Sequence, residues 1–223
     1  MKRYTLFVLL CGLAWGQAAD YANSGYRTLE GRENVARTLT AHDRDTRQRP
    51  LNLVERLKIE PGMTVADVGT GPGYMLPHLS KAVGPGGMVI AEDIFPDFLE
   101  KARDRARLNN LNGVEFVQGT ERDPRLPAGA VDLVLVLDAY HHFDYPQQML
   151  AAIGAALKPG GRLAIVEYYK NGFRDPKHIR VDEKELIQEV ESAGFQLALN
   201  EEFNPKSQYL AVFKKSPETR GAQ

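Results

Sequence analysis

The sequence predicts an α/β fold, a doubly wound sheet of seven mostly parallel strands that ends in a C-terminal antiparallel hairpin. Short apolar segments with strand character alternate with segments whose apolar residues recur at helical spacing, which is typical of a parallel sheet covered by helices on both faces. The segment "VDLVLVL" at 131–137 is apolar enough to be buried on both faces. Two strand-like segments close the chain with no helix between them, which predicts the hairpin.

Composition is consistent with one ordinary globular domain preceded by a separate N-terminal segment. The chain has 223 residues, of which 43% are hydrophobic and 26% are charged, and its net charge is −1. This balance gives no bulk electrostatic reason for binding nucleic acid, so we expect no nucleic-acid partner.

Residues 1–19 are predicted to be a secretory signal peptide. A basic start is followed by the apolar segment "TLFVLLCGLAW", and Gly16 and Ala18 are spaced as at a cleavage site. The apolar segment is too short to span a bilayer comfortably, so we expect export to the periplasm or medium without stable membrane insertion. A cytoplasmic location is the alternative if the signal is not used. Cys11 is the only cysteine and would leave with the signal, so the mature chain would have no cysteine metal site.

Residues 20–50 are predicted to form a helical or irregular cap segment. They contain six arginines among acidic residues, which fits either a solvated surface or a cap over a pocket for an anionic substrate. The main domain is expected over 51–216, with a short tail at 217–223.

The elements of the main domain follow in order along the chain. Helical spacing over 51–59 stops at a Pro-Gly pair, and prolines open two later helices while glycines end them. The expected strands are 65–68, 88–94, 114–117, 131–137, 163–166, 195–203 and 208–213. The expected helices are 74–83, 96–112, 146–157 and 181–193.

A glycine-rich loop, "VADVGTGPGY" at 65–74, follows the first strand of the sheet. Ligands of such sheets bind beyond the carboxyl ends of the strands. The dinucleotide-binding fingerprint requires a small residue at the position of Tyr74. A phosphate-binding P-loop requires Gly-Lys-Ser/Thr after the glycines, and this sequence has none there. A carboxylate, Asp67, instead precedes the glycines, which suits a ligand that carries an ammonium group. The loop therefore favours an amino-acid-bearing nucleoside.

From about Leu51 to Lys214 the chain resembles the class I S-adenosylmethionine-dependent methyltransferases. Four segments carry the resemblance in order: "VADVGTGPG", "MVIAEDI", "GTERDPRLPAGAVDLVLVLDAYHHF" and "LKPGGRLAIVEY". The resemblance implies the Rossmann-like fold of that family, S-adenosylmethionine as cofactor, and methyl transfer as the activity.

The resemblance also assigns cofactor residues. Asp93 would bind the ribose hydroxyls, while Glu92, one residue earlier on the strand, is expected to point to the opposite face. Thr120 stands where the family often has an aspartate at the adenine, so Glu121 or Asp123 are alternatives for that contact. The methionine end would be held by Asp67, Gly69, Gly71, Gly73 and Asp138.

Methyl transfer needs alignment and a deprotonated or neutral nucleophile. The segment "DAYHHF" at 138–143 supplies Tyr140, His141 and His142 as expected catalytic residues, with a histidine as proton acceptor. One histidine packing against the next helix is the alternative. The pairs His142–Asp144 and Glu167–His178 match no recognised metal spacing, so we expect no metal site.

The acceptor class is narrowed by what the sequence lacks. No Asn-Pro-Pro-Tyr motif is present, and no added recognition domain is visible, so a small-molecule acceptor is expected. A non-catalytic S-adenosylmethionine-binding sensor and, less favoured because of Tyr74, a nicotinamide-dependent oxidoreductase are the alternatives. The sequence does not define an oligomeric state.

Overall fold

A computed structural model describes residues 18–215, so most of the predicted signal peptide and all of the predicted tail lie outside the described residues. It contains a seven-stranded sheet in the order β3-β2-β1-β4-β5-β7-β6. All neighbouring strands are parallel except β7, which runs antiparallel to both β5 and β6. This confirms the predicted fold class. The strands are β1 (Thr64–Val68), β2 (Met88–Asp93), β3 (Val114–Gln118), β4 (Val131–Leu137), β5 (Leu157–Tyr168), β6 (Phe195–Asn204) and β7 (Gln208–Lys215).

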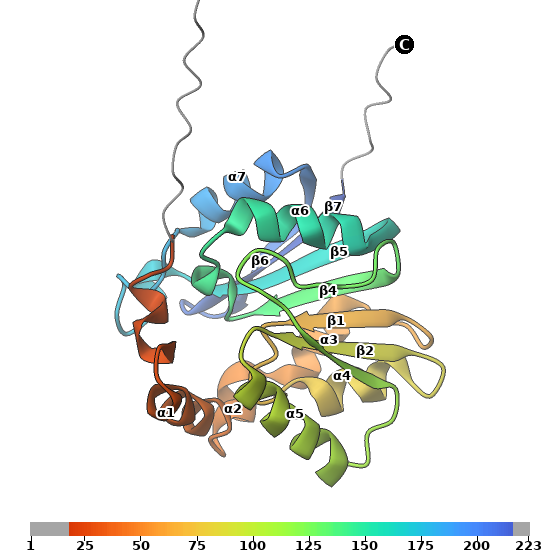
Figure 1. The fold of residues 1–223 in the computed structure, drawn as a ribbon. Helices are drawn as coiled ribbons and strands as arrows, with labels where there is room; N and C mark the ends of the chain where they lie inside the picture. Colours follow the sequence, from red (N-terminus) through yellow and green to blue (C-terminus); the bar gives the residue numbers. More distant parts are fainter. Residues whose placement is uncertain (1–17, 216–223) are drawn as a thin grey trace, which may run out of the picture.

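Helices cover both faces of the sheet: α3, α4 and α5 lie on one face, and α6 and α7 on the other (Figure 1). Their bounds are α3 (Pro50–Leu57), α4 (Leu76–Val83), α5 (Pro96–Leu108), α6 (Pro146–Ala156) and α7 (Glu183–Ser192). The N-terminal segment forms η1 (Ala22–Tyr26), α1 (Leu29–Leu39) and α2 (Arg44–Gln48). Two further 3₁₀ turns follow strands, η2 (Tyr140–His142) and η3 (Lys170–Gly172).

The hydrophobic core forms two layers, one on each side of the sheet. Val65 and Leu133 pack in the layer with the side chains of α3 and α4. Their strand neighbours Ala66 and Val134 pack in the other layer, with α6 and α7. This alternation follows from the two-residue period of a strand, and all four side chains are fully buried.

Two element boundaries differ from the predicted ones for physical reasons. β5 begins at Leu157, six residues before the predicted start, because Leu157 pairs with Val131 on β4 and the pairing resumes at Arg162 with Leu133 after a register shift. α7 begins at Glu183, where Asp182 and Glu185 form a reciprocal capping box that satisfies backbone donors.

The N-terminal segment lies beside the carboxyl ends of the parallel strands (Figure 1). The backbone nitrogen of Ala19 donates to Asp144 Oδ1 at 3.1 Å, and Arg32 pairs with Asp97 at 2.9 Å. The Tyr26 ring stacks on Phe95, with 5.9 Å between ring centroids. These contacts fix residues 18–50 over one edge of the sheet.

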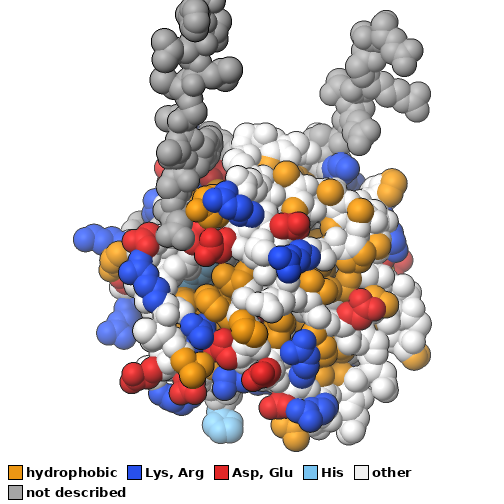
Figure 2. Space-filling model, in the orientation of Figure 1, with side chains coloured by type: hydrophobic (Ala, Val, Ile, Leu, Met, Phe, Trp, Pro, Cys, Tyr) orange, Lys and Arg blue, Asp and Glu red, His pale blue; other side chains and the backbone are white. Residues whose placement is uncertain are grey.

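Charged side chains of both signs are interspersed on the face shown in Figure 2, in keeping with the small net charge. Among residues 18–215, no helix combines the length and the apolar character needed to cross a bilayer.

Candidate functional site

A cavity lies at the carboxyl ends of β1, β2 and β4. The strand order runs outward in opposite directions from the neighbouring strands β1 and β4. This is the topological switch point at which open α/β sheets bind ligands. The cavity has a volume of about 120 Å³ and is open to solvent on one side. Residues 18–50 contribute part of its wall: Asn23, Tyr26, Leu39 and Arg44.

The glycine loop forms the floor of the cavity through Gly69 and Gly71. Gly71 has a φ of 55°, and its backbone nitrogen donates to Asp93 Oδ2 at 2.9 Å, which ties the loop to β2. Gly73 is not among the cavity residues. A Cβ at Gly73 would lie 2.8 Å from Leu76 Cδ1 and 3.0 Å from Ala102 Cα, so this glycine allows α4 and α5 to pack closely.

Asp67, predicted to hold the methionine end, is buried beneath the loop rather than lining the cavity. Its Oδ2 accepts a hydrogen bond from Thr70 Oγ1 at 2.7 Å, and Thr70 does line the cavity. Burial raises the pKa of Asp67 to about 6. In this geometry Asp67 shapes the loop from below.

Asp93 lines the cavity at the end of β2, as predicted for the ribose carboxylate. Its two oxygens accept backbone hydrogen bonds from Gly71 and from Phe95, each at 2.9 Å. Burial raises its pKa to about 6 against the lowering effect of these bonds. Asp93 therefore organises the loop and the start of α5 as well as facing the cavity.

Glu92 also lines the cavity, so its expected position on the opposite face of β2 from Asp93 does not remove it from the site. The cavity sits over the edge of the sheet and is reached from both faces of β2. Gly119 leaves room for the side chain, since a Cβ there would lie 1.9 Å from Glu92 Oε1. Gly69 N donates to Oε2 at 3.3 Å, while Oε1 is buried with no hydrogen-bond partner among the described residues. Burial raises the pKa of Glu92 well above its ordinary value.

The two residues predicted to lie near the adenine, Thr120 and Glu121, have different surroundings in the structure. Glu121 lines the cavity. Thr120 lies in a shallow pocket beside it and accepts hydrogen bonds through Oγ1 from the backbone nitrogens of Arg122 and Asp123, at 3.3 Å and 3.0 Å. Thr120 therefore shapes the turn after β3, and the structure brings Glu121 to the cavity.

Asp138 lines the cavity directly after β4, as predicted, with a φ of 53°. Gln208 Nε2 donates to Asp138 Oδ1 at 2.6 Å. Burial, together with nearby Glu167, raises the pKa of Asp138 to about 7.

Arg44 is a cavity residue that sequence reasoning did not single out. It is 7% exposed, its guanidinium carbon lies 4.0 Å from the centroid of the Tyr74 ring, and Nη1 donates to Leu39 O at 2.5 Å. Arg44 is one of six arginines in residues 20–50, and only the tertiary structure distinguishes it from the others.

The three expected catalytic residues on η2 have different surroundings. Tyr140 is fully buried outside the cavity, and its hydroxyl donates to Glu189 Oε2 on α7 at 2.7 Å. His141 is buried behind the cavity, with Nδ1 2.8 Å from Glu167 Oε2. Of the three, His142 alone lines the cavity.

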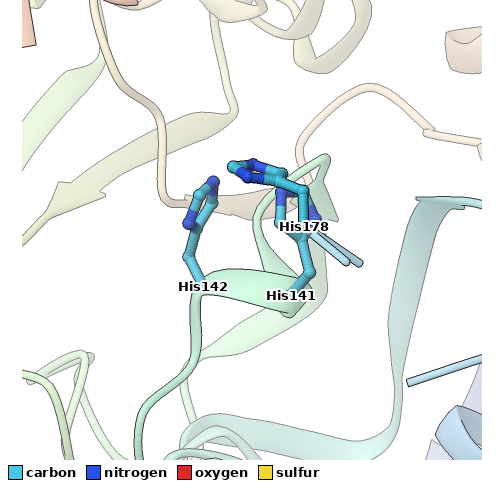
Figure 3. A group of neighbouring side chains, drawn as sticks. All are labelled: His141, His142 and His178. Atoms are coloured by element: carbon cyan, nitrogen blue, oxygen red, sulfur yellow. The ribbon is translucent and has the colours of Figure 1, made fainter. Parts of the chain in front are cut away.

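A third histidine, His178, joins this pair from the loop between η3 and α7. Its ring centroid lies 5.0 Å from that of His141 and 5.3 Å from that of His142, and its ring stacks on Phe173. Figure 3 shows the three rings gathered together. The spacing of the three histidines in the sequence does not indicate this cluster.

Comparisons with known proteins agree with the site. A family described as "Methyltransferase domain" matches residues 66–165, from the glycine loop to β5. The UbiE ubiquinone/menaquinone biosynthesis C-methyltransferase of Ectopseudomonas mendocina is 31% identical over 53% of this chain and 47% of that protein. A 37.1 kDa protein in transposon TN4556 of Streptomyces fradiae is 36% identical over 52% of this chain and 33% of that protein. The chain thus spans about half or less of these curated relatives.

Among solved structures, a SAM-dependent methyltransferase from Aquifex aeolicus superimposes with a TM-score of 0.77 and 27% identity, over 82% of this chain and 97% of that chain. Together with the family match, this supports a class I S-adenosylmethionine-dependent methyltransferase, and S-adenosylmethionine is the cofactor.

The residues of the cavity fit this cofactor. Glu92 Oε1 is a buried acceptor that lacks a donor among the described residues, and ribose hydroxyls can supply one. The buried cation of Arg44 suits the cofactor's carboxylate, and Gly71 keeps the floor of the cavity clear of a side chain.

Proposed function

We propose that the protein transfers a methyl group from S-adenosylmethionine to a small molecule. The observation that carries this proposal is one cavity that combines the glycine loop, the carboxylates of Glu92 and Asp93, and a buried arginine with His142. A dinucleotide is disfavoured because Tyr74 stands where the dinucleotide fingerprint requires a small residue.

In this proposal the chain's residues bind the cofactor at three places. Glu92 and Asp93 accept hydrogen bonds from the ribose hydroxyls, and charge-assisted bonds of this kind are the stronger ones. Arg44 pairs with the carboxylate of the methionine moiety, and Asp138 faces its ammonium group. Glu121 is the group nearest the adenine.

The acceptor lies beside His142. The cofactor supplies a methyl group made electrophilic by its sulfonium. Asn23 Oδ1 lies 2.9 Å from His142 Nδ1, which places the ring proton on Nδ1 and leaves the lone pair on Nε2, to which the Tyr26 hydroxyl donates at 3.3 Å. Burial lowers the pKa of His142 well below its ordinary value, so the imidazole is neutral. Residues 18–50 form one wall of the site.

The test is transfer of isotopically labelled methyl groups. The purified protein is incubated with labelled S-adenosylmethionine and pooled small-molecule extracts, and products are separated by mass. We expect a labelled small molecule with the wild type and none with a variant that has lost cofactor binding. Labelling of the protein or of nucleic acid only would contradict the proposal, and cofactor binding without any labelled product would favour a non-catalytic sensor.

We also propose that the protein is exported, on the basis of the pattern in residues 1–19. Cell fractionation followed by N-terminal sequencing of the native protein tests this. Export predicts a mature N-terminus near Ala19 in the periplasm or medium, whereas an intact Met1 in the cytoplasm would contradict it.

A further inference from the structure

Three imidazole rings meet beside the cofactor cavity, and sequence spacing does not reveal them as a group. His141 and His142 lie on η2 after β4, while His178 comes from the loop before α7. One ring nitrogen from each histidine lies within 4.8 Å of those of the other two, and the rings converge in Figure 3. His142 connects this cluster to the cavity.

Hydrogen bonds orient two of the rings as metal ligands are oriented. His141 Nδ1 lies 2.8 Å from Glu167 Oε2, and His142 Nδ1 lies 2.9 Å from Asn23 Oδ1. Each Nδ1 therefore donates its proton to an oxygen, and each Nε2 keeps its lone pair. At His142 a metal ion would take the place of the Tyr26 hydroxyl, which lies 3.3 Å from Nε2. Metal-ligating histidines almost always donate their other ring N–H to a carboxylate or carbonyl in this way.

Hydrogen bonds also fix the orientation of the Asn23 side chain that contacts His142. Asn23 Nδ2 donates to His142 O and to Asp144 Oδ2, both at 3.1 Å, so the amide oxygen must face the His142 ring. Glu167 is held as firmly, because the backbone nitrogens of His141 and Tyr168 both donate to its carboxylate, at 3.1 Å and 2.7 Å.

Electrostatics around the cluster also suit a bound cation. Glu167 supplies a buried carboxylate behind His141. The positive charge of Arg180 acts against a cation at His141, but Arg180 pairs with Glu189 at 2.6 Å.

We propose that His141, His142 and His178 bind a divalent transition-metal ion, with Zn²⁺ as the preferred metal. Three imidazoles with an open fourth position form a common zinc site of the catalytic type. Zinc–nitrogen bonds of about 2.0–2.1 Å place tetrahedral ligands roughly 3.3 Å apart, so small ring rotations close the present cluster onto the ion.

The open position would face the cavity next to His142, which defines the acceptor class. This step rests on the proposed methyltransferase function. A metal ion there lowers the pKa of an acceptor hydroxyl group. The hydroxyl proton leaves to solvent, and the oxygen bonds to the methyl carbon as the bond from that carbon to sulfur breaks. The acceptor is therefore a hydroxyl-bearing small molecule.

Metal titration tests the site without any activity measurement. The protein is purified without a histidine tag, stripped with a chelator, and titrated with Zn²⁺ against a chromophoric competitor, and with Co²⁺ by visible absorption. We expect one Zn²⁺ per chain, the visible bands of four-coordinate Co²⁺, and no comparable binding of Mg²⁺.

His178→Ala is the diagnostic variant because His178 is half-buried on a loop, and His42→Ala on an exposed position is its matched control. His178→Ala should lose more affinity than the roughly 10- to 100-fold expected for Glu167→Gln, which removes only an orienting carboxylate. Unchanged Zn²⁺ affinity in a folded His178→Ala, or substoichiometric binding by the wild type, would overturn the proposal. Cofactor affinity, measured separately, shows whether the methyltransferase proposal fails on its own.

Discussion

Glu92 and Asp93 are consecutive residues at the end of β2, and both line the same cavity. Asp93 uses both oxygens to hold backbone nitrogens of the glycine loop and of α5. Glu92 presents the oxygen that lacks a partner among the described residues. The alternation of a strand predicts opposite directions for the two side chains, and both nevertheless line the cavity at the end of β2.

We therefore expect Glu92→Ala and Asp93→Ala both to weaken S-adenosylmethionine binding, each by about 1.5–3 kcal/mol, or roughly ten- to hundredfold. Calorimetric titration gives the affinities. Asp93→Ala should also lower the melting temperature, because two backbone donors lose their acceptor. Glu115→Ala, an exposed carboxylate on β3, is the control and should change neither quantity. Wild-type affinity in Glu92→Ala would show that its unpaired oxygen does not face the cofactor.

Arg44 contributes the cavity's buried positive charge, and the proposed function pairs it with the cofactor's carboxylate. Arg44→Met keeps most of the packing against Tyr74 and removes the charge. We expect S-adenosylmethionine affinity to fall about ten- to hundredfold while adenosine, which has no carboxylate, binds as before.

The control for this comparison is Arg47→Met, an exposed arginine on the same helix whose partner is Asp43. It should bind both ligands normally. Equal losses for adenosine and S-adenosylmethionine in Arg44→Met would mean that Arg44 supports the fold of the cavity rather than the carboxylate.

At the level of elements, the loop between β1 and α4 depends on a backbone conformation that only glycine adopts easily. Gly71 has a φ of 55° and lines the cavity. Gly71→Val adds a branched side chain in the ligand's space and costs about 1–2 kcal/mol of stability for the left-handed conformation. We expect a folded protein, by circular dichroism, without measurable S-adenosylmethionine binding.

Gly160→Val is the control that distinguishes backbone strain from steric obstruction of the ligand site in Gly71→Val. Gly160 has a φ of 78° and open space around it, in the irregular start of β5 far along the chain from the loop. It should lose comparable stability and keep its cofactor affinity. If Gly71→Val binds normally, the glycine loop is not the floor of the cofactor site.

Periodicity predicted the elements well because each one follows local rules. β4 is apolar on both faces, and prolines at the first turns of α5 and α6 begin those helices where expected. The early start of β5 was missed because its pairing depends on a bulge opposite β4, which no local pattern encodes. The His178 contact was missed for the same reason, since 36 residues separate it from His142.

Side-chain direction was the least predictable feature of the site. Tyr140 and Asp67 have the residue types expected of functional groups, yet one bonds to α7 and the other to Thr70 beneath the loop. Only the packing of neighbouring elements decides these directions.

At the scale of the whole molecule, the burial of Asp67 and Asp93 predicts that cofactor binding depends on pH. Asp67 and Asp93 have their pKa raised from an ordinary value near 3.8 to about 6. The folded protein without cofactor therefore holds protons that the unfolded chain has lost, and its stability falls as pH rises from about 4 to about 6.

The ribose hydroxyls and the cofactor's positive charges favour the ionised carboxylates, so binding releases protons. We expect S-adenosylmethionine affinity to rise from about pH 4 to about pH 6 by up to about tenfold per pH unit for each proton released, and to level off at higher pH. Calorimetry in buffers of different ionisation enthalpy counts those protons. Asp93→Asn should flatten the slope, and an affinity independent of pH would show that the carboxylates do not change ionisation on binding.

The central claim is that the cavity at the glycine loop binds S-adenosylmethionine, and direct calorimetric titration with a competing ligand tests it. We predict saturable binding of S-adenosylmethionine and of S-adenosylhomocysteine, one molecule per chain, and no binding of NAD at the same concentrations. Tight binding of NAD without binding of S-adenosylmethionine would contradict the account.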